Sequence, residues 1–393
     1  MFLFGAGKSV KQKLIFDIGS SRVNCVLASF GSGEKIDVKR LFRSENVIMP
    51  EVNLRGLWRK IYALIENVMW EYEKSGRKAD EAMVVFSSPW YFSDSRLVSK
   101  KFDPPIVIDK KFIAEIMLAQ ENSFKKDTSS YFGFLQEDLA LTRSLIMSAK
   151  LNGYPVREPR QNILGKRAVE FFVSIYISAI FSEAAAGIKK LLENHGVKST
   201  EFRSSPRVLF DIFLREGYKD LFVVDIGGEI TDLILIKGGQ MLKMASFGRG
   251  INYVARRVGS ALRLDLNEVS ELISNYMENK LDDKFKRSLE VVLKEAVKEW
   301  QNLFKEALEK RVLPDLAPEK IMLTGHGKIS AFHEALSDPS FKRYTAHGRS
   351  FSIIEQTSDK MKGFFKNYDQ ILDKPYLDLI GFYLIYAANY AAK

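Results

Sequence analysis

The chain has 393 residues, of which 46% are hydrophobic and 27% are charged, as in soluble globular proteins large enough for two or more domains. A single cysteine, Cys25, excludes an internal disulfide, and together with only four histidines it argues against a zinc site. The net charge is +10, but Lys and Arg are dispersed along the sequence and no nucleic-acid-binding motif occurs, so we expect solvated surfaces and no nucleic-acid partner.

The first predicted elements form a hairpin whose turn is built from small residues. An apolar strand over 14–18 contains Asp17 and runs into Gly19-Ser20-Ser21-Arg22, and a second apolar strand covers 23–30. Backbone N–H groups in such a turn can approach phosphate oxygens, because no bulky side chain blocks them. A carboxylate at the strand end can hold Mg²⁺, usually through water. Taken alone, Asp and Gly after a strand are also ordinary turn chemistry.

The remainder of the first half alternates regular elements with a segment of different texture. The pattern predicts strands over 36–42, 83–87 and 168–180, and helices over 54–74, 182–194 and 207–216. Between residues 88 and 165 the sequence contains Pro104-Pro105, a helix over 110–124 that Asp109 can cap, and a strand over 144–151. We interpret 88–165 as a small inserted α+β subdomain.

The second half opens with a hairpin of the same design. An apolar strand over 221–226 contains Asp225 and runs into Gly227-Gly228-Glu229-Ile230-Thr231-Asp232, followed by strands over 233–237 and 240–247. Both hairpins place a Gly two residues after the Asp and add a third strand. This repetition favours an internally duplicated architecture in which two Asp turns clamp the phosphates of one nucleotide.

Helices dominate the rest of the chain. Predicted helices cover 251–259, 266–276 and 282–310, and the wide apolar stripe of the last one indicates a core-facing helix. A short strand over 321–324 runs into Gly325-His326-Gly327 and a helix over 330–336, where a base or a phosphate can lie against the backbone. The final uncharged stretch, 379–392, has the length of a core helix and is too short to span a membrane.

These three glycine-containing segments resemble the two phosphate loops and the adenosine loop of the actin, heat-shock chaperone and hexokinase ATPase superfamily. The insertion makes the chain most similar to the FtsA and PilM branch, whose members carry a small SHS2-type subdomain there. The resemblance implies an α/β protein with two duplicated ribonuclease-H-like lobes, a nucleotide cleft between them and the inserted α+β subdomain. It implies lobe I over 1–87 and 166–216, lobe II over 217–247 and 320–393, and a helical subdomain of lobe II over 248–319.

The site residues implied by the resemblance come from all three loops. Asp17 and Asp225 match the superfamily's catalytic, Mg²⁺-associated carboxylates. The adenosine would lie against Gly325, His326 and Gly327. The residues expected around the phosphates are Gly19, Ser20, Ser21, Arg22, Gly227, Gly228, Glu229 and Thr231.

Three departures from the family pattern bear on nucleotide binding. Glu229 adds negative charge near the phosphates, where it could repel ATP, orient a water or pair with a Lys. His326 stands where relatives often have Gly. Ser270 and Ile273 fall where relatives supply a Glu and a Lys to the ribose and base.

The resemblance implies a cytoplasmic scaffold that binds ATP and Mg²⁺, self-associates into protofilaments or dimers, and is at most a slow ATPase. Its partners would belong to the cell-division or type IV pilus machinery, and a partner would hold it at the inner face of the membrane. Peripheral contact of its basic surface with the membrane is also open. Two other hypotheses remain: a small-molecule kinase with Glu229 or Asp232 as base, and a degenerate adaptor with an empty cleft.

Overall fold

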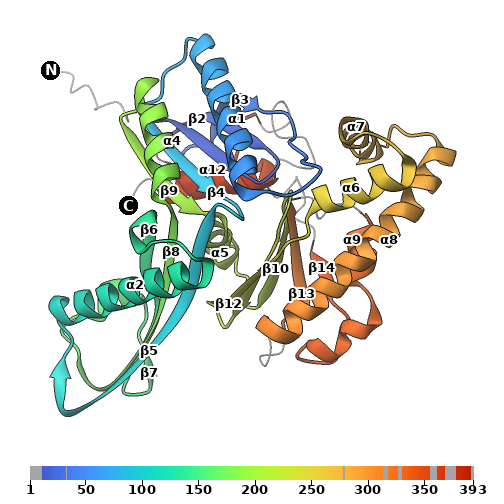
Figure 1. Cartoon of the computed structure of the whole chain (residues 1–393). Helices are drawn as coiled ribbons and strands as arrows, with labels where there is room; N and C mark the ends of the chain where they lie inside the picture. Colours follow the sequence, from blue (N-terminus) through green and yellow to red (C-terminus); the bar gives the residue numbers. More distant parts are fainter. Residues whose placement is uncertain are drawn as a thin grey trace.

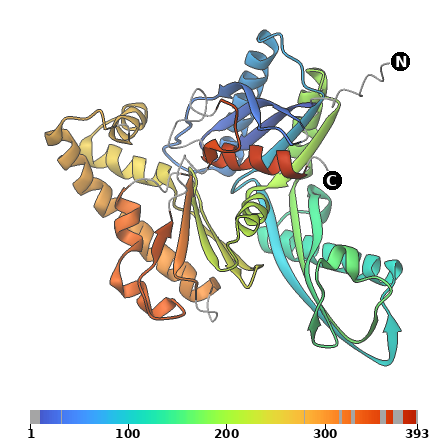
Figure 2. The same cartoon turned by 180° about the vertical axis from the view of Figure 1, so that it is seen from behind.

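The computed structural model describes residues 11–31, 33–277, 279–312, 317–325, 330–354, 361–367 and 378–390. The chain forms two lobes side by side and a third, elongated unit that projects from the first lobe (Figure 1). Figure 2 shows the same arrangement from behind, with the last helix lying across the back of the first lobe. None of the helices within the described ranges combines the length and apolar character needed to cross a bilayer.

Lobe I is built on a five-stranded sheet with the order β3-β2-β1-β4-β9. Its first three strands are antiparallel, and β4 and β9 then run parallel to β1. Successive side chains along these strands point alternately to opposite faces of the sheet, and each face is covered by a hydrophobic core. Because both faces are buried, the strands have continuous apolar runs. Their bounds are β1 Lys11–Ile18, β2 Val23–Phe30, β3 Asp37–Arg43, β4 Glu81–Phe86 and β9 Ser199–Ser204, with helices α1 Leu54–Lys74 and α4 Ser182–Asn194.

Lobe II repeats this topology. Its five-stranded sheet has the order β12-β11-β10-β13-β14, which matches the first sheet strand for strand in direction and connectivity. The duplicated α/β architecture predicted from the two hairpins is therefore confirmed. The bounds are β10 Leu221–Ile226, β11 Thr231–Lys237, β12 Gln240–Phe247, β13 Lys320–Gly325 and β14 Ser352–Ile354.

A helical layer covers the second sheet. The apolar stripe of α8 is buried in the lobe II core, where Trp300 stacks on Phe304 and contacts Phe332 edge to face, so the predicted core-facing role of this helix is confirmed. Asp282 caps α8 by accepting hydrogen bonds from two backbone N–H groups. The elements are α6 Ile251–Leu262, α7 Leu266–Met277, α8 Asp283–Ala307, the π-helical turn Leu308–Val312, α9 Ser330–Leu336 and the 3₁₀ segment Pro339–Tyr344.

The projecting unit is a four-stranded antiparallel sheet, β5-β8-β6-β7, with helix α2 packed against it. The sequence pattern missed β5, because Pro104 and Pro105 interrupt it; the pairing with β8 shifts register between Lys101 and Ile106 at this point. Strand β8 pairs with both β5 and β6, so we propose that this unit ends near residue 181 and not at 165. Its elements are β5 Tyr91–Val107, α2 Lys110–Phe132, the 3₁₀ turn Gln136–Asp138, β6 Leu139–Leu151, β7 Tyr154–Pro155, α3 Pro159–Asn162 and β8 Arg167–Phe181.

Two helices, α5 (Ser205–Arg215) and α12 (Asp378–Tyr390), join the lobes at the base of the cleft. They pack against each other within one core, which also takes residues from both central sheets. Helix α12 contacts β1 and β2 of lobe I as well as β13 of lobe II. We therefore propose that α12 belongs to the hinge between the lobes, whereas the family resemblance placed it in lobe II.

Candidate functional site

The two Asp turns have the same backbone geometry. In the first turn the Gly19 N–H donates to the Arg22 carbonyl at 3.0 Å, and in the second the Gly227 N–H donates to the Ile230 carbonyl, also at 3.0 Å. Asp17 and Asp225 precede these turns at equivalent strand positions. The fold therefore places the same short structure at the edge of each lobe, facing the other.

A small central cavity lies between these turns. Its volume is about 50 Å³, and Asp17, Asp225 and Asp232 all line it, together with Gly325 and Leu379. The predicted residues Gly19, Ser20, Ser21, Arg22, Gly227 and Gly228 line it as well. The fold thus brings residues from both turns and from the end of β13 to a single cavity.

The acids of the cavity are buried and have raised pKa values. Burial raises the pKa of Asp17 to about 6, although the Asn24 amide, 3.1 Å away, and the nearby Arg22 charge lower it. Burial and then the neighbouring Asp232 carboxylate raise the pKa of Asp225 to about 7, against the hydrogen bond from Thr324. Charged oxygens without a counterion are costly at this site, because little water reaches them.

Asp232 was considered only as a possible base, and the structure gives it a different setting. It lies opposite Asp225 across the hairpin and accepts hydrogen bonds from Ser88 at 2.7 Å and Tyr91 at 3.0 Å. These two donors belong to the other side of the cleft, next to lobe I. Asp232 therefore ties the second hairpin to the first lobe, and burial raises its pKa.

The two turns touch each other directly. The Glu229 N–H donates to the Ser20 hydroxyl at 2.8 Å. A Cβ atom placed on Gly228 would lie 2.5 Å from the Ser21 Cβ, so only glycine fits at this contact. The space in which a triphosphate would lie between the turns is therefore filled by the turns themselves.

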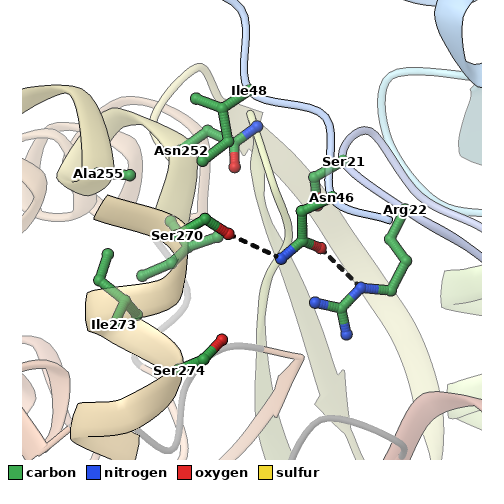
Figure 3. Close-up of a pocket in the computed structure, with 10 residues that line it drawn as sticks. Ser21, Arg22, Asn46, Ile48, Asn252, Ala255, Ser270, Ile273 and Ser274 are labelled. Atoms are coloured by element: carbon green, nitrogen blue, oxygen red, sulfur yellow. Dashed lines mark hydrogen bonds between the residues drawn. The ribbon is translucent and has the colours of Figure 1, made fainter. Parts of the chain in front are cut away.

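A second set of contacts closes the outer part of the cleft. The segment 46–49, which follows β3 and which we call the bridging segment, reaches from lobe I to helices α6 and α7. Its Val47 carbonyl accepts from Asn252 at 3.0 Å, and its Met49 carbonyl accepts from Arg256 at 3.1 Å. Asn46 joins Arg22 and Ser270 by hydrogen bonds of 2.7 and 3.3 Å, as Figure 3 shows. These bonds connect the lobes without any ligand.

The Glu229 side chain is the anchor of this closure. Its buried carboxylate binds Arg256 through both guanidinium nitrogens, at 2.7 and 3.0 Å, and accepts from Asn252 at 2.8 Å. Its side chain does not line the central cavity and pairs with an Arg on α6, so the place of Glu229 beside the phosphates stays a prediction. Glu229 orients the two side chains that hold the bridging segment.

Thr231 also lies away from the cavity. Its hydroxyl donates to the Arg249 carbonyl at 2.7 Å and accepts from the Trp300 indole at 2.9 Å, deep in lobe II. The Thr231 hydroxyl is thus engaged within lobe II, and its contact with the phosphates stays a prediction. Residues alternate sides along β11, so Ile230 and Asp232 line the cavity while Thr231 points into the core.

The position expected for the adenosine is narrow. Ser270 and Ile273 line an outer cavity of about 30 Å³, and Ile48 of the bridging segment occupies its other wall (Figure 3). Gly325 has a positive φ of 67°, and a Cβ there would meet the Ile226 carbonyl at 2.5 Å, which explains the need for glycine. The other two predicted adenosine residues, His326 and Gly327, lie outside the described residues.

The donor set fits a hard cation better than it fits a whole nucleotide. Asp17 Oδ1 and Asn24 Oδ1 are buried and have no hydrogen-bond partner among the described residues. Such oxygens are the ligands that Mg²⁺ prefers, although no group of three metal-binding side chains occurs within the described ranges. Drug-sized ligands need roughly 300–1,000 Å³, whereas the two cavities offer about 50 and 30 Å³. Each cavity is therefore smaller than a site that encloses a whole nucleotide.

Sequence reasoning missed several residues of this site. Asn24 and Asp232 each stand seven residues after their Asp and pair with it across the hairpin, so the duplicated spacing contained a usable signal. The bridging segment, Asn252 and Arg256 gave no such signal. Their role depends on contacts between segments about 200 residues apart in the chain.

Comparisons with known proteins agree with this architecture. No protein-family model matches the chain. The cell division protein FtsA of Neisseria meningitidis is 27% identical over 139 residues, which are 35% of this chain and 32% of FtsA, so the match spans about a third of that relative. A chain of the PilM–PilN type IV pilus biogenesis complex superposes with a TM-score of 0.60 at 15% identity, covering 96% of this chain and 98% of its own length.

These findings establish the fold. The chain has the bilobed actin-like ATPase fold. This fold is consistent with the resemblance of its sequence to the FtsA and PilM branch.

Proposed function

We propose that this protein is an actin-like scaffold, resembling FtsA, that links a membrane-associated partner to a polymerising or assembly machine. The observation that carries the proposal is the full-length match to a PilM–PilN complex, projecting subdomain included. The local match to FtsA, a cell division protein, supports the same kind of role. A PilM-like place in pilus assembly is the alternative reading. In either case we propose a cytoplasmic protein held at the inner face of the membrane by its partner, and self-association into dimers or protofilaments.

We further propose that the cleft responds to Mg²⁺ and ATP by opening. The buried acids Asp17 and Asp225 have raised pKa values, and Asp17 Oδ1 has no partner among the described residues. A cation bound there would neutralise these charges and supply Lewis-acid stabilisation to phosphate oxygens. The residues of this chain would hold the cation, present turn N–H groups and exclude water. Release of the bridging segment would change the lobe angle and hence the surfaces offered to partners.

A second candidate is an adaptor that needs no nucleotide. The direct contact between Gly228 and Ser21 and the Glu229–Arg256 pair favour it, because both fill or close the cleft with the protein's own atoms. A small-molecule kinase has less support. Glu229 is bound by Arg256, Asp232 is bound by Ser88 and Tyr91, and neither carboxylate faces a cavity large enough for an acceptor.

Thermal unfolding with and without ligand separates the two candidates. A ligand present at 100 times its dissociation constant adds about 2.7 kcal/mol to the free energy of unfolding. We expect Mg·ATP to raise the melting temperature, Mg²⁺ alone to raise it less, and Asp225→Asn to abolish both shifts. Asp80→Asn, an exposed acid on lobe I, is the matched control and should keep them.

Absence of any shift at millimolar Mg·ATP would reject the nucleotide-responsive scaffold in favour of the adaptor. Electron microscopy and pelleting of the same samples test self-association independently. Filaments or dimers support the scaffold with or without nucleotide, whereas a strict monomer at high concentration contradicts the self-associating form.

A further inference from the structure

The structure gathers positive charge at one end of the projecting unit, although the sequence showed no cluster. We call this end the basic tip and define it as residues 100–111 and 150–170. Strand pairing brings the two segments together, with Lys101 opposite Glu170 and Val107 opposite Arg167. Both views place the tip at the far end of the unit, away from the lobes (Figures 1 and 2).

The basic tip carries half of the net charge of the whole chain. It has nine cationic and four anionic side chains, a net of +5 against +10 for the complete sequence. All nine cationic residues are exposed. They are Lys100, Lys101, Lys110, Lys111, Lys150, Arg157, Arg160, Lys166 and Arg167.

Two of the four acids already have partners in the projecting unit. Glu170 pairs with Lys101 at 3.1 Å. Asp109 caps helix α2 by accepting from the Phe112 N–H at 2.7 Å. Because nine cations stand against four acids, two of which are engaged in these contacts, the field of the tip toward solvent is positive.

A wide hollow of about 760 Å³ opens at the tip. Its cationic lining residues are Arg157, Lys166 and Arg167, and its neutral polar lining includes Asn152 and Gln161. None of the described residues that line it is acidic. Guanidinium and ammonium donors around an open hollow suit phosphate oxygens.

Apolar side chains project beside these charges. Tyr154 is 77% exposed, Val107 54% and Leu164 38%. Tyr154 follows a tight turn in which Asn152 and Gly153 have φ of 53° and 82°, so it stands at the apex of the β6–β7 hairpin. A tyrosine ring with a polar end suits the boundary between lipid headgroups and acyl chains. The three apolar residues lie on different elements, Val107 at the end of β5, Tyr154 in β7 and Leu164 in a turn, unlike the continuous apolar core of a protein–protein interface.

We propose that the basic tip docks on an anionic membrane surface, with lipid phosphates in the hollow and Tyr154, Val107 and Leu164 inserted among the headgroups. Each Lys or Arg near such a surface contributes roughly 1 kcal/mol, which gives a tip of this charge measurable affinity. The residues of the tip would lie only at the level of the headgroups, so the contact is reversible. The site lies outside the cleft and does not depend on the proposed response to nucleotide.

Cosedimentation of the full chain with vesicles tests the proposal. The probes are neutral vesicles of phosphatidylcholine alone and anionic vesicles that also contain phosphatidylglycerol, at about 30 mole per cent. The test variant reverses three lining cations: Arg157→Glu, Lys166→Glu and Arg167→Glu. The control variant reverses three exposed lysines on the lobes, Lys60→Glu, Lys284→Glu and Lys298→Glu, and so has the same net charge.

We expect the wild type and the control variant to bind anionic vesicles and not to bind neutral vesicles. The tip variant should bind anionic vesicles at least about ten-fold more weakly than the wild type. Tyr154→Ser should weaken binding without changing its salt dependence. Equal loss in the tip and control variants would overturn the proposal, since net charge alone would explain it. Retention of binding by a tip variant that melts like wild type would overturn it as well. Preference of the tip for soluble polyglutamate over vesicles would show that an acidic protein is the partner instead.

Discussion

The two Asp hairpins share a backbone turn but differ in what faces the acid. In lobe I, Asn24 lies opposite Asp17 and donates to its carboxylate. In lobe II, the equivalent position is Asp232, a second acid, and it raises the pKa of Asp225. The position of Ser21 in the first turn is taken by Glu229 in the second, which binds Arg256. One hairpin therefore presents a single acid to the cleft, and the other presents two acids and the anchor of the closure.

This difference shows that the duplicated turns have separate tasks. The lobe I turn supplies hydroxyl and amide groups and an acid, Asp17, one of whose oxygens has no hydrogen-bond partner in the part of the chain that the structure describes. The lobe II turn supplies the contacts that keep the lobes together, through Asp232, Glu229 and Gly228. Changing single residues in each turn can test whether this division of roles holds.

The largest loss of stability is expected when Glu229 loses its partner Arg256. Arg256→Ala would leave the buried Glu229 carboxylate without its main partner and should lower the free energy of unfolding by about 3–5 kcal/mol. Arg257→Ala is the matched control, because the Arg257–Glu299 pair is half exposed and should cost less than about 1 kcal/mol. Urea unfolding curves measure both. If the two variants lose similar stability, the lobe II turn does not hold the cleft closed.

The next effect concerns pH. A carboxyl whose pKa is raised in the folded state binds its proton more tightly there than in the unfolded chain. Its stabilising contribution is complete below pH 4 and is lost as pH rises through about 6 for Asp17 and about 7 for Asp225. We expect the free energy of unfolding to fall over this range by roughly 3 kcal/mol for Asp17 and roughly 4 kcal/mol for Asp225.

Variants at the two acids assign this pH dependence. Asp17→Asn should remove the loss of stability that ends near pH 6, and Asp225→Asn should remove the loss that ends near pH 7. Each variant should be more stable than the wild type at pH 8 when Mg²⁺ is absent. Chemical denaturation at several pH values provides the measurement. A decline in stability that both variants retain would show that other groups cause it.

A smaller effect tests the contact between the turns. Gly228→Ala places a Cβ 2.5 Å from the Ser21 Cβ and should cost about 1–3 kcal/mol while widening the cleft. Gly19→Ala is the control in the first turn, where the nearest atom lies 3.4 Å away, an ordinary contact distance. Small-angle scattering reports the lobe separation. Equal stability and equal dimensions for the two variants would contradict direct packing of the turns.

The smallest effect sharpens the comparison of the acids themselves. Asp232→Asn makes the second hairpin resemble the first, and removal of the neighbouring charge should lower the pKa of Asp225 from its value of about 7. Carboxyl NMR titration measures this pKa directly. An unchanged pKa would mean that burial alone sets it.

Much of the fold followed from local sequence patterns. Helix α1 occupies the range that its apolar stripe predicted, and Asp109 caps α2 as expected. The two hairpins occur where the strand and turn residues indicated. The two elements that we propose to reassign to other units, β8 and α12, form regular structure as predicted but pack with partners far away in the chain. Periodicity reports which face of an element is apolar, and it does not report which sheet or lobe covers that face.

The sequence by itself determined the duplicated Asp turns, the helices and the bilobed fold class, because strand alternation, capping and turn chemistry act between residues close in the chain. Only the tertiary structure decided that Glu229 binds Arg256, that Gly228 touches Ser21, and that dispersed cations meet at the basic tip. These features depend on distances of a few ångströms between segments separated by tens to hundreds of residues. Such distances are set by the packing of whole elements, which no local pattern contains.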